Sequence, residues 1–131
     1  MRIRCFPAVP VILALLTGIF LRVFVFDIFR VEGRSMEPAI KSENILLVSR
    51  AAYGLRNPLA EGYLLRWSTP RVQELIVYRD PRDGEFRIKR CAAVSDLGVV
   101  LRGDNSGDSV DSRLYGSVPV ERIIGKVLIC F

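Results

Sequence analysis

A long uncharged apolar segment near the N-terminus constrains the fold of this chain more than any other feature. Residues 5–21 contain no charged side chain, and Arg2 and Arg4 precede them. As a helix, this run would extend about 26 Å, close to the thickness of the hydrocarbon core of a bilayer. Arg22 follows the run, and its long side chain could reach the interface and lengthen the span. The sequence therefore predicts one N-terminal transmembrane helix.

A cleaved signal peptide is the competing interpretation of the same segment. Such a peptide needs small residues at Ala-X-Ala spacing after its apolar core, but this core ends in LTGIF at residues 16–20. The sequence therefore favours an uncleaved signal-anchor. Arg2 and Arg4 would then remain inside, with the rest of the chain on the outer side of the membrane. We divide the chain into a cytoplasmic tip with the anchor, residues 1–29, and an extracytoplasmic domain, residues 30–131.

The charge of the remaining chain limits the function classes that are open to it. Residues 31–131 carry 15 basic and 13 acidic side chains, a balance of +2, so the net charge of +5 for the whole chain gives no case for nucleic-acid binding. The sequence has no metal-ligand cluster and no glycine-rich phosphate loop, and we expect no metal and no cofactor. A disulfide between Cys91 and Cys130 stays open, because nothing in the sequence requires it.

Short β-rich runs, bounded by turn residues, predict that the ectodomain is one small, mainly β domain. The alternation near the anchor would place Asp27, Phe29 and Val31 on one face of a strand. The turn PRDG at residues 81–84 predicts a hairpin, whereas residues 57–71 lack a period and predict a long loop. The predicted strands are residues 23–32, 44–49, 74–78, 85–94, 98–101 and 123–129.

The absence of histidine limits how a serine could act as a nucleophile. Ser35 lies in the run GRSMEP, residues 33–38, and Lys89 in FRIKR, residues 86–90. Without histidine, a Ser-His-Asp triad is excluded, and lysine becomes a candidate base. Arginine cannot lose its proton, and this chain has 16 arginines but only three lysines. Lowering the pKa of Lys89 from ~10.4 to ~7 would require roughly 5 kcal/mol of desolvation or like-charge repulsion.

Each of these features also has an ordinary structural explanation. Ser35 could be an N-cap of a helical turn, and Lys89 could be a surface lysine in a strand. The polar loop at residues 103–113 (GDNSGDSVDSR) could be solvated or could bind calcium, although its acidic spacing does not match an EF-hand. Such a loop could also hold catalytic groups through supporting hydrogen bonds.

Six short segments follow one another in a fixed order along this chain. They are SMEP (35–38), NILLV (44–48), YGLRNP (53–58), IKR (88–90), the polar loop 103–113 and the trailing GSVP (116–119). Taken together, these ordered segments resemble those of bacterial type I signal peptidases. The resemblance runs from the anchor to the end of the chain, and it implies a small antiparallel β-sheet catalytic domain of the signal-peptidase and SOS-repressor-protease type behind one transmembrane helix.

The resemblance implies a serine endopeptidase in the bacterial cytoplasmic (inner) membrane, with its N-terminus inside and its catalytic domain on the outer face. Its partners would be membrane lipid and the signal peptides of exported preproteins, cut after small residues at −1 and −3. By the same resemblance, Ser35 is the nucleophile, Lys89 is the general base, and Ser109 orients the lysine. The remaining implied residues are an ion-pair frame of Asp111 with Arg90 and Arg113, and pockets lined by Val31, Met36, Ile40 and Ile88.

Two departures and three alternatives accompany the resemblance. Gly33 stands where many members carry serine or threonine, and AAVSD at residues 92–96 replaces the usual GLPGD after the lysine. One alternative is a specialised Ser-Lys peptidase for a dedicated secretion or pilin-like substrate. A self-cleaving Ser-Lys protein of the SOS-repressor kind is disfavoured by the membrane anchor. The remaining alternative is an inactive membrane-tethered binding module of the same fold.

Overall fold

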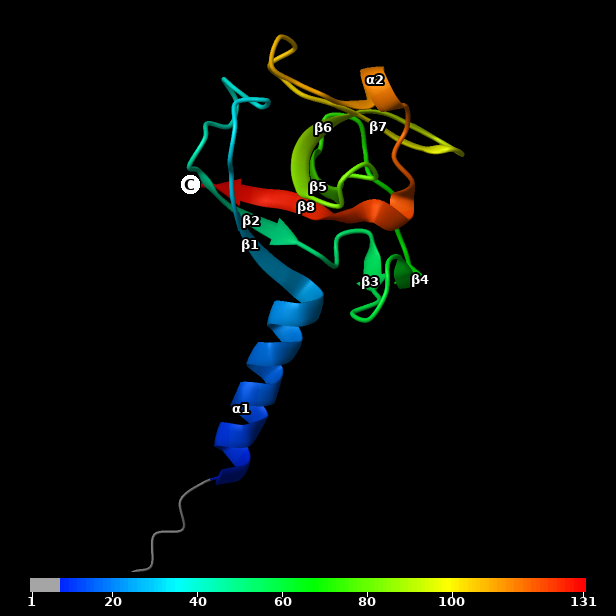
Figure 1. Ribbon diagram of the computed structural model, residues 1–131. Helices are drawn as coiled ribbons and strands as arrows, with labels where there is room; N and C mark the ends of the chain where they lie inside the picture. The colour runs from blue at the N-terminus through cyan, green and yellow to red at the C-terminus, as the bar shows by residue number, and fades with distance from the viewer. Residues whose placement is uncertain (1–7) are drawn as a thin grey trace, which may run out of the picture.

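The structure is a computed structural model that describes residues 8–131, in which one helix projects from a β domain (Figure 1). Helix α1, Ala8–Phe20, continues into a π-helical turn, η1, Leu21–Val25. The predictions placed on Arg2, Arg4 and Cys5 lie outside the described residues.

The helical segment has the properties expected of a membrane span by length and composition. Ala8–Val25 forms an 18-residue apolar segment of mean hydropathy 2.4, and no part of it is buried inside the protein. The sequence interpretation was wrong in starting a strand at residue 23, because the helix continues to Val25 and the strand begins at Phe26. No turn residue interrupts this stretch, so helical hydrogen bonding persists, and the Phe26 amide donates to the Leu21 carbonyl. The predicted division after residue 29 therefore falls inside the first strand.

Six antiparallel strands form the main sheet, and the prediction of a mainly β domain is confirmed. Their spatial order is β1-β2-β8-β5-β6-β7, so β1 and β7 are the two edges. Short helical segments α2, Ser112–Tyr115, and η2, Val120–Arg122, lie between β7 and β8. The strands are β1 (Phe26–Arg30), β2 (Ile45–Ser49), β5 (Leu75–Arg79), β6 (Phe86–Ser95), β7 (Gly98–Arg102) and β8 (Ile123–Cys130).

The hairpin predicted from the turn at residues 81–84 is present between β5 and β6. The Asp80 amide donates to the carbonyl of Glu85 at 2.8 Å, which closes the hairpin. The buried Asp80 carboxylate accepts hydrogen bonds from the Arg82 amide and guanidinium, and Arg82 also stacks over Tyr115. Because β6 pairs with β5 residue by residue, with Lys89 opposite Ile76, this hairpin fixes the position of Lys89.

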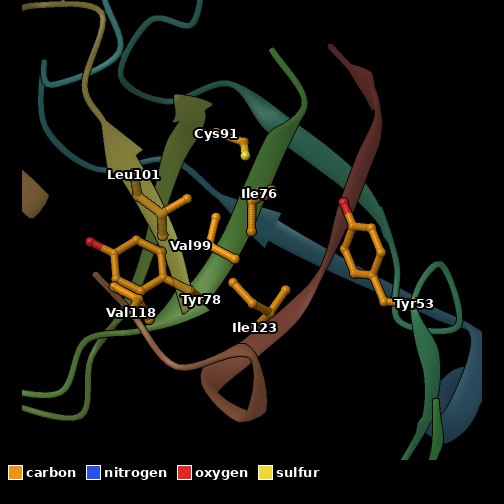
Figure 2. Close-up of a cluster of buried hydrophobic side chains, with 8 residues drawn as sticks. All are labelled: Tyr53, Ile76, Tyr78, Cys91, Val99, Leu101, Val118 and Ile123. Atoms are coloured by element: carbon orange, nitrogen blue, oxygen red, sulfur yellow. The ribbon is translucent and has the colours of Figure 1, made fainter. Parts of the chain in front are cut away.

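Two hydrophobic clusters support the sheet. In the first, Ile76, Val99 and Ile123 gather between Tyr78 and Tyr53, as Figure 2 shows, with Cys91, Leu101 and Val118 completing the group. The second cluster includes side chains from the segment that follows β1. Its buried members are Val31, Met36, Ile40, Leu46, Val48, Val77 and Ile124. Cys91 is buried in the first cluster and Cys130 is exposed, and both are free thiols.

The long loop predicted at residues 57–71 contains a strand that the sequence pattern did not show. β3, Gly54–Arg56, pairs with β4, Tyr63–Arg66, as a separate two-stranded sheet. A Cβ at Gly54 would lie 2.9 Å from the Arg66 Cα, so only glycine allows the two strands to approach this closely. Both strands are too short for a periodicity of two to be recognised.

Candidate active site

Ser35 lies in a compact turn that follows β1. The chain leaves the sheet at Val31, whose amide and carbonyl bond to Asn44 and Glu43 and close the intervening segment into a loop. Within this loop, Met36 and Ile40 are only 1% exposed, and the Ile40 amide donates to the Met36 carbonyl at 2.9 Å. These two buried side chains anchor the turn in the core, and this anchoring keeps the half-buried Ser35 at the surface of a cleft.

Lys89 lies in the middle of β6 and is only 3% exposed. Burial lowers the pKa of its ammonium group from 10.5 to about 8, and the nearby positive charge of Arg87 acts in the same direction. Attraction to Asp111 opposes the shift without cancelling it. Among residues 8–131, no side chain forms a hydrogen bond or an ion pair with this ammonium group. Lys89 is therefore a buried lysine that loses its proton more readily than an ordinary one.

Ser35 and Lys89 line the same cleft, which has a volume of about 560 Å³. β1 and β6 do not pair with each other, and residues from both strands line this space. The rings of Phe29 and Phe86 lie with their centroids 5.5 Å apart at one end. The cleft walls are residues 29–35, residues 85–89, Leu46, Val77, Asp108 and Val110.

The polar loop after β7 packs directly on the turn that carries Ser35. The Asn105 amide donates to the Ser35 carbonyl at 3.0 Å, and the Asn105 side chain donates to the Arg34 carbonyl at 3.1 Å. A Cβ at Gly103 would lie 2.7 Å from the Ser35 carbonyl oxygen and would collide with the Ser109 side chain. Glycine is therefore required at this position for the loop to approach the serine turn.

Asp111 is fully buried and organises the polar loop. Its carboxylate accepts hydrogen bonds from the Gly103 amide at 2.8 Å, from the Ser109 hydroxyl at 3.0 Å and from the Arg113 guanidinium at 2.7 and 2.9 Å. Burial alone would raise the pKa of Asp111, but these hydrogen bonds outweigh it and hold the pKa well below its usual range. Asp111 and Arg113 therefore form an ion pair, and its role in the site stays a prediction.

Other details of the predicted site need correction. Arg90 does not join Asp111; it forms a two-pronged pair with Asp104, at 2.9 and 2.7 Å. The Ser109 hydroxyl donates to Asp111, and the structure contains no hydrogen bond from Ser109 to Lys89. In both cases the polar side chain binds a nearby carboxylate, which is the strongest available partner. The direction of each side chain decides which carboxylate it reaches, and the spacing of residues along the sequence does not give that direction. The orienting role of Ser109 stays a prediction.

The predicted pocket residues divide into two groups. Val31 and Ile88 line the cleft, whereas Met36 and Ile40 belong to the cluster beneath it and do not reach its wall. Sequence reasoning also missed the contacts of Asp104 and Asn105, although it identified the loop that contains them. No sequence pattern indicates the ion pair between Asp104 and Arg90, because the two residues lie 14 positions apart in different segments of the chain.

Comparison with known proteins points to one family. Residues 3–97 match the family model described as signal peptidase, peptidase S26. A protein named Signal peptidase I from Pseudomonas aeruginosa is 27% identical over 124 residues, covering 92% of this chain and 39% of the relative. One of the same name from Bacillus caldolyticus is 26% identical over an alignment of 148 residues, covering 82% and 80%.

The match to the family model includes both Ser35 and Lys89 and ends before the polar loop. This chain spans about two fifths of the length of two relatives, 39% of the one from Pseudomonas aeruginosa and 40% of one from Pseudomonas fluorescens. It spans 80% of the length of the Bacillus caldolyticus relative. Because the family model covers most of the chain, this protein belongs to the signal peptidase family, peptidase S26.

Proposed function

We propose that this protein is a membrane-bound serine endopeptidase that removes signal peptides from exported preproteins, with Ser35 as nucleophile and Lys89 as general base. The observation that carries the proposal is the buried Lys89, with a pKa of about 8, in the same cleft as Ser35. In a chain without histidine, a neutral amine of this kind is a group able to accept a serine proton near neutral pH. At pH 7, about one tenth of such lysines are neutral.

The proposed reaction runs through an acyl-enzyme. As the Ser35 oxygen attacks the scissile carbonyl carbon, its proton moves to the Lys89 amine, and a tetrahedral oxyanion forms. The backbone N–H of Ser35 would donate to this oxyanion, since Gly33 offers no hydroxyl for that role. Collapse breaks the peptide C–N bond, and Lys89 returns the proton to the leaving amine. Water then attacks the ester with Lys89 again as base, which releases the signal peptide and restores Ser35.

The polar loop would support this chemistry by holding the serine turn against β6. Asn105 bonds to the serine turn, Asp104 bonds to Arg90 on β6, and Asp111 ties the two ends of the loop together. Because Asp111 already accepts hydrogen bonds from Arg113, Ser109 and Gly103, its charge is largely compensated and leaves Lys89 free to deprotonate. Ser109 would therefore act on Lys89 through Asp111.

The substrate would bind as an extended segment in the cleft. Side chains alternate in direction along an extended chain, so those at −1 and −3 would face the wall that contains Val31 and Ile88, and the side chain at −2 would face away. Met36 and Ile40 would set the depth of this wall from beneath it. We expect small residues at −1 and −3 and tolerance at −2.

The segment Ala8–Val25 would anchor the enzyme in the bacterial cytoplasmic membrane, with the β domain on the outer face. Ser35 follows the end of this segment by ten residues, five of which form β1. The cleft would therefore lie near the lipid headgroups, where the cleavage bond of a signal peptide emerges from the membrane. We propose the division into anchor and catalytic domain on this basis.

The experiment that tests the proposal is cleavage of a generic preprotein by the purified chain in detergent. We expect cleavage after an Ala-X-Ala site, located by mass spectrometry, and no cleavage by Ser35→Ala. Tryptophan at −1 or −3 should block cleavage, whereas tryptophan at −2 should be accepted. Equal cleavage of all three tryptophan precursors would refute the pocket assignment. No cleavage of any preprotein by a folded chain would favour the inactive binding module.

A further inference from the structure

A second cleft lies on the other side of Phe86 from the candidate active site, and its lining is rich in arginine. It has a volume of about 410 Å³, and Phe86 lines both clefts. Four arginines face only two glutamates across this space, and no part of the proposed catalysis uses them. These six charged residues are Arg50, Arg56, Arg79, Arg122, Glu61 and Glu121.

Arg56 is a buried cation without a carboxylate partner among the residues that the structure describes. It is only 6% exposed, and its guanidinium donates to the main-chain oxygens of Glu121 and Ile123 and lies 5.2 Å from the centre of the Tyr63 ring. Its Nε–H is buried and has no hydrogen-bond acceptor among residues 8–131. Buried charges in proteins are normally paired, and an orphaned buried donor points to a missing water or ion.

The other three arginines of this cleft are also incompletely neutralised. Arg50 donates to Asp27 through one Nη at 2.8 Å, but its Nε–H is buried and has no acceptor in the described part of the chain. Arg79 and Arg122 approach the two oxygens of a single carboxylate, Glu61, at 3.7 and 3.6 Å, which is longer than a hydrogen bond. The cleft thus combines excess positive charge with two unused buried donors.

The cleft lies beside the end of the apolar helical segment. The Arg50 amide donates to the carbonyl of Val25 at 2.8 Å, so the cleft adjoins the last residue of the apolar helix. Figure 1 shows β3 and β4 at the end of the β domain from which this helix emerges. This hairpin carries exposed apolar side chains, at 94% for Leu59, 61% for Leu64, 63% for Leu65 and 56% for Trp67.

From these observations we infer that the arginine cleft binds the phosphate of an anionic membrane phospholipid, with the apolar hairpin residues beside its acyl chains. Guanidinium groups bind phosphate through paired charge-assisted hydrogen bonds, and basic groups beside a membrane attract anionic lipids. The inference rests on the membrane attachment in the proposed function. It adds a lipid-binding site next to the substrate cleft, with Phe86 as the shared wall.

The test uses the full chain in a neutral detergent and the fluorescence of Trp67, the single tryptophan of the protein. Short-chain phosphatidylglycerol is titrated, with phosphatidylcholine of the same chain length and inorganic phosphate as separate arms. We expect a saturable change with phosphatidylglycerol and a much weaker response to the other two. An equal response to inorganic phosphate would overturn the lipid as the source, and an equal response to phosphatidylcholine would overturn recognition of negative charge.

Variants of the more accessible cleft residues distinguish binding from a structural role. Arg122→Gln and Arg79→Gln should each weaken phosphatidylglycerol binding about tenfold, the effect of losing one charge-assisted hydrogen bond. Glu61→Gln should tighten binding, because it removes the carboxylate that competes for both arginines. Arg71→Gln, an exposed arginine outside the cleft, is the matched control. Unchanged binding in the arginine variants, or weaker binding in Glu61→Gln, would overturn the site.

These measurements are independent of catalysis. A chain that cleaves preproteins but binds phosphatidylglycerol no better than the Arg122→Gln variant would refute the lipid site alone. A chain that binds phosphatidylglycerol as expected but cleaves no preprotein would refute the proposed function alone.

Discussion

Two cations in neighbouring clefts are both buried away from water, and their charges are accommodated in different ways. Lys89 is 3% exposed and Arg56 is 6% exposed, and neither has a carboxylate within ion-pair distance among residues 8–131. Burial lowers the pKa of the lysine to about 8, so the lysine loses its proton, and with it the charge, more easily. The arginine cannot deprotonate, so its charge remains and must be compensated by carbonyl oxygens, an aromatic ring and, we propose, a lipid phosphate.

The comparison shows how residue type decides the response to a similar environment. Desolvation lowers the pKa of a lysine, whereas an arginine keeps its charge, and for this reason we propose a base in one cleft and an anion site in the other. Asp111 lies near enough to Lys89 to raise its pKa by attraction. The Asp111 carboxylate already accepts hydrogen bonds from Arg113, Ser109 and the Gly103 amide, so this attraction does not cancel the effect of burial. A carboxylate with free lone pairs at that position would keep the lysine protonated.

The largest effect on cleavage should come from replacing Lys89, the buried lysine of the first cleft, with arginine. Lys89→Arg keeps the charge but removes the removable proton, and we expect preprotein cleavage to fall by at least ~1,000-fold, as for the loss of a general base. The chain should still fold, at a lower melting temperature, because a permanent charge is buried. Lys41→Arg, an exposed lysine, is the control and should retain normal cleavage. A fall of less than about tenfold in Lys89→Arg would refute the assignment of the base.

The pH dependence of cleavage should report the lowered pKa of Lys89. Below a pKa of about 8, the neutral fraction of the lysine falls tenfold for each pH unit, so kcat/KM should be about 100-fold lower at pH 6 than at its plateau. The measurement is kcat/KM for a preprotein between pH 6 and pH 10. A flat profile over this range would contradict a lysine base.

Removing the charge of Asp111 should destabilise the domain more than any other change in the polar loop. Asp111→Asn weakens three charge-assisted contacts in a fully buried position, and we expect a loss of about 3–5 kcal/mol in the free energy of unfolding at pH 7. Because the pKa of Asp111 is depressed in the folded protein, this contribution is complete above pH ~4 and is lost as pH falls further. Denaturant unfolding measures the effect, and Asp96→Asn in the exposed β6–β7 turn is the control.

Lys89→Met should remove a rise in stability that the wild type shows at alkaline pH. The folded protein holds Lys89 at a pKa of about 8 against 10.5 for an ordinary lysine, so the unfolded chain binds more protons between these values. Stability should therefore rise with pH over this range in the wild type, by about 3 kcal/mol from this residue. The difference between wild type and Lys89→Met isolates the lysine, because the tyrosines and cysteines titrate equally in both. No change in that difference between pH 7 and pH 11 would refute the shifted pKa.

The smallest effect should come from exchanging the cation in the second cleft. Arg56→Lys places a removable proton in a buried site, where desolvation should lower the pKa of the new amine as it does for Lys89. We expect phosphatidylglycerol binding to weaken severalfold at pH 7 and further at pH 9, on the order of the loss of one charge-assisted contact. The wild type should bind equally at both pH values. Binding by Arg56→Lys that is independent of pH would show that burial alone does not control the charge at this position.

Much of the fold followed from local sequence pattern, and the errors have physical causes. The apolar run, the five strands from residue 44 onward and the hairpin at residues 81–84 depend on periodicity and turn chemistry between neighbours, so they were predicted correctly. The end of the apolar helical segment was misplaced, because Val23 and Val25 satisfy a strand pattern as well as a helical one. The β3–β4 pair was missed, because its strands are held by the close approach at Gly54 and not by a repeating pattern.

The sequence by itself determined the class of this protein and the candidate pair Ser35 and Lys89, because the absence of histidine, the rarity of lysine and the order of the segments are properties of the chain. Only the tertiary structure decided which partners the polar side chains take. Arg90 pairs with Asp104, Ser109 donates to Asp111, and Arg56 is buried with no carboxylate partner in the described part of the chain. These choices depend on side-chain direction and on desolvation by distant segments, and neither quantity is encoded by spacing along the chain.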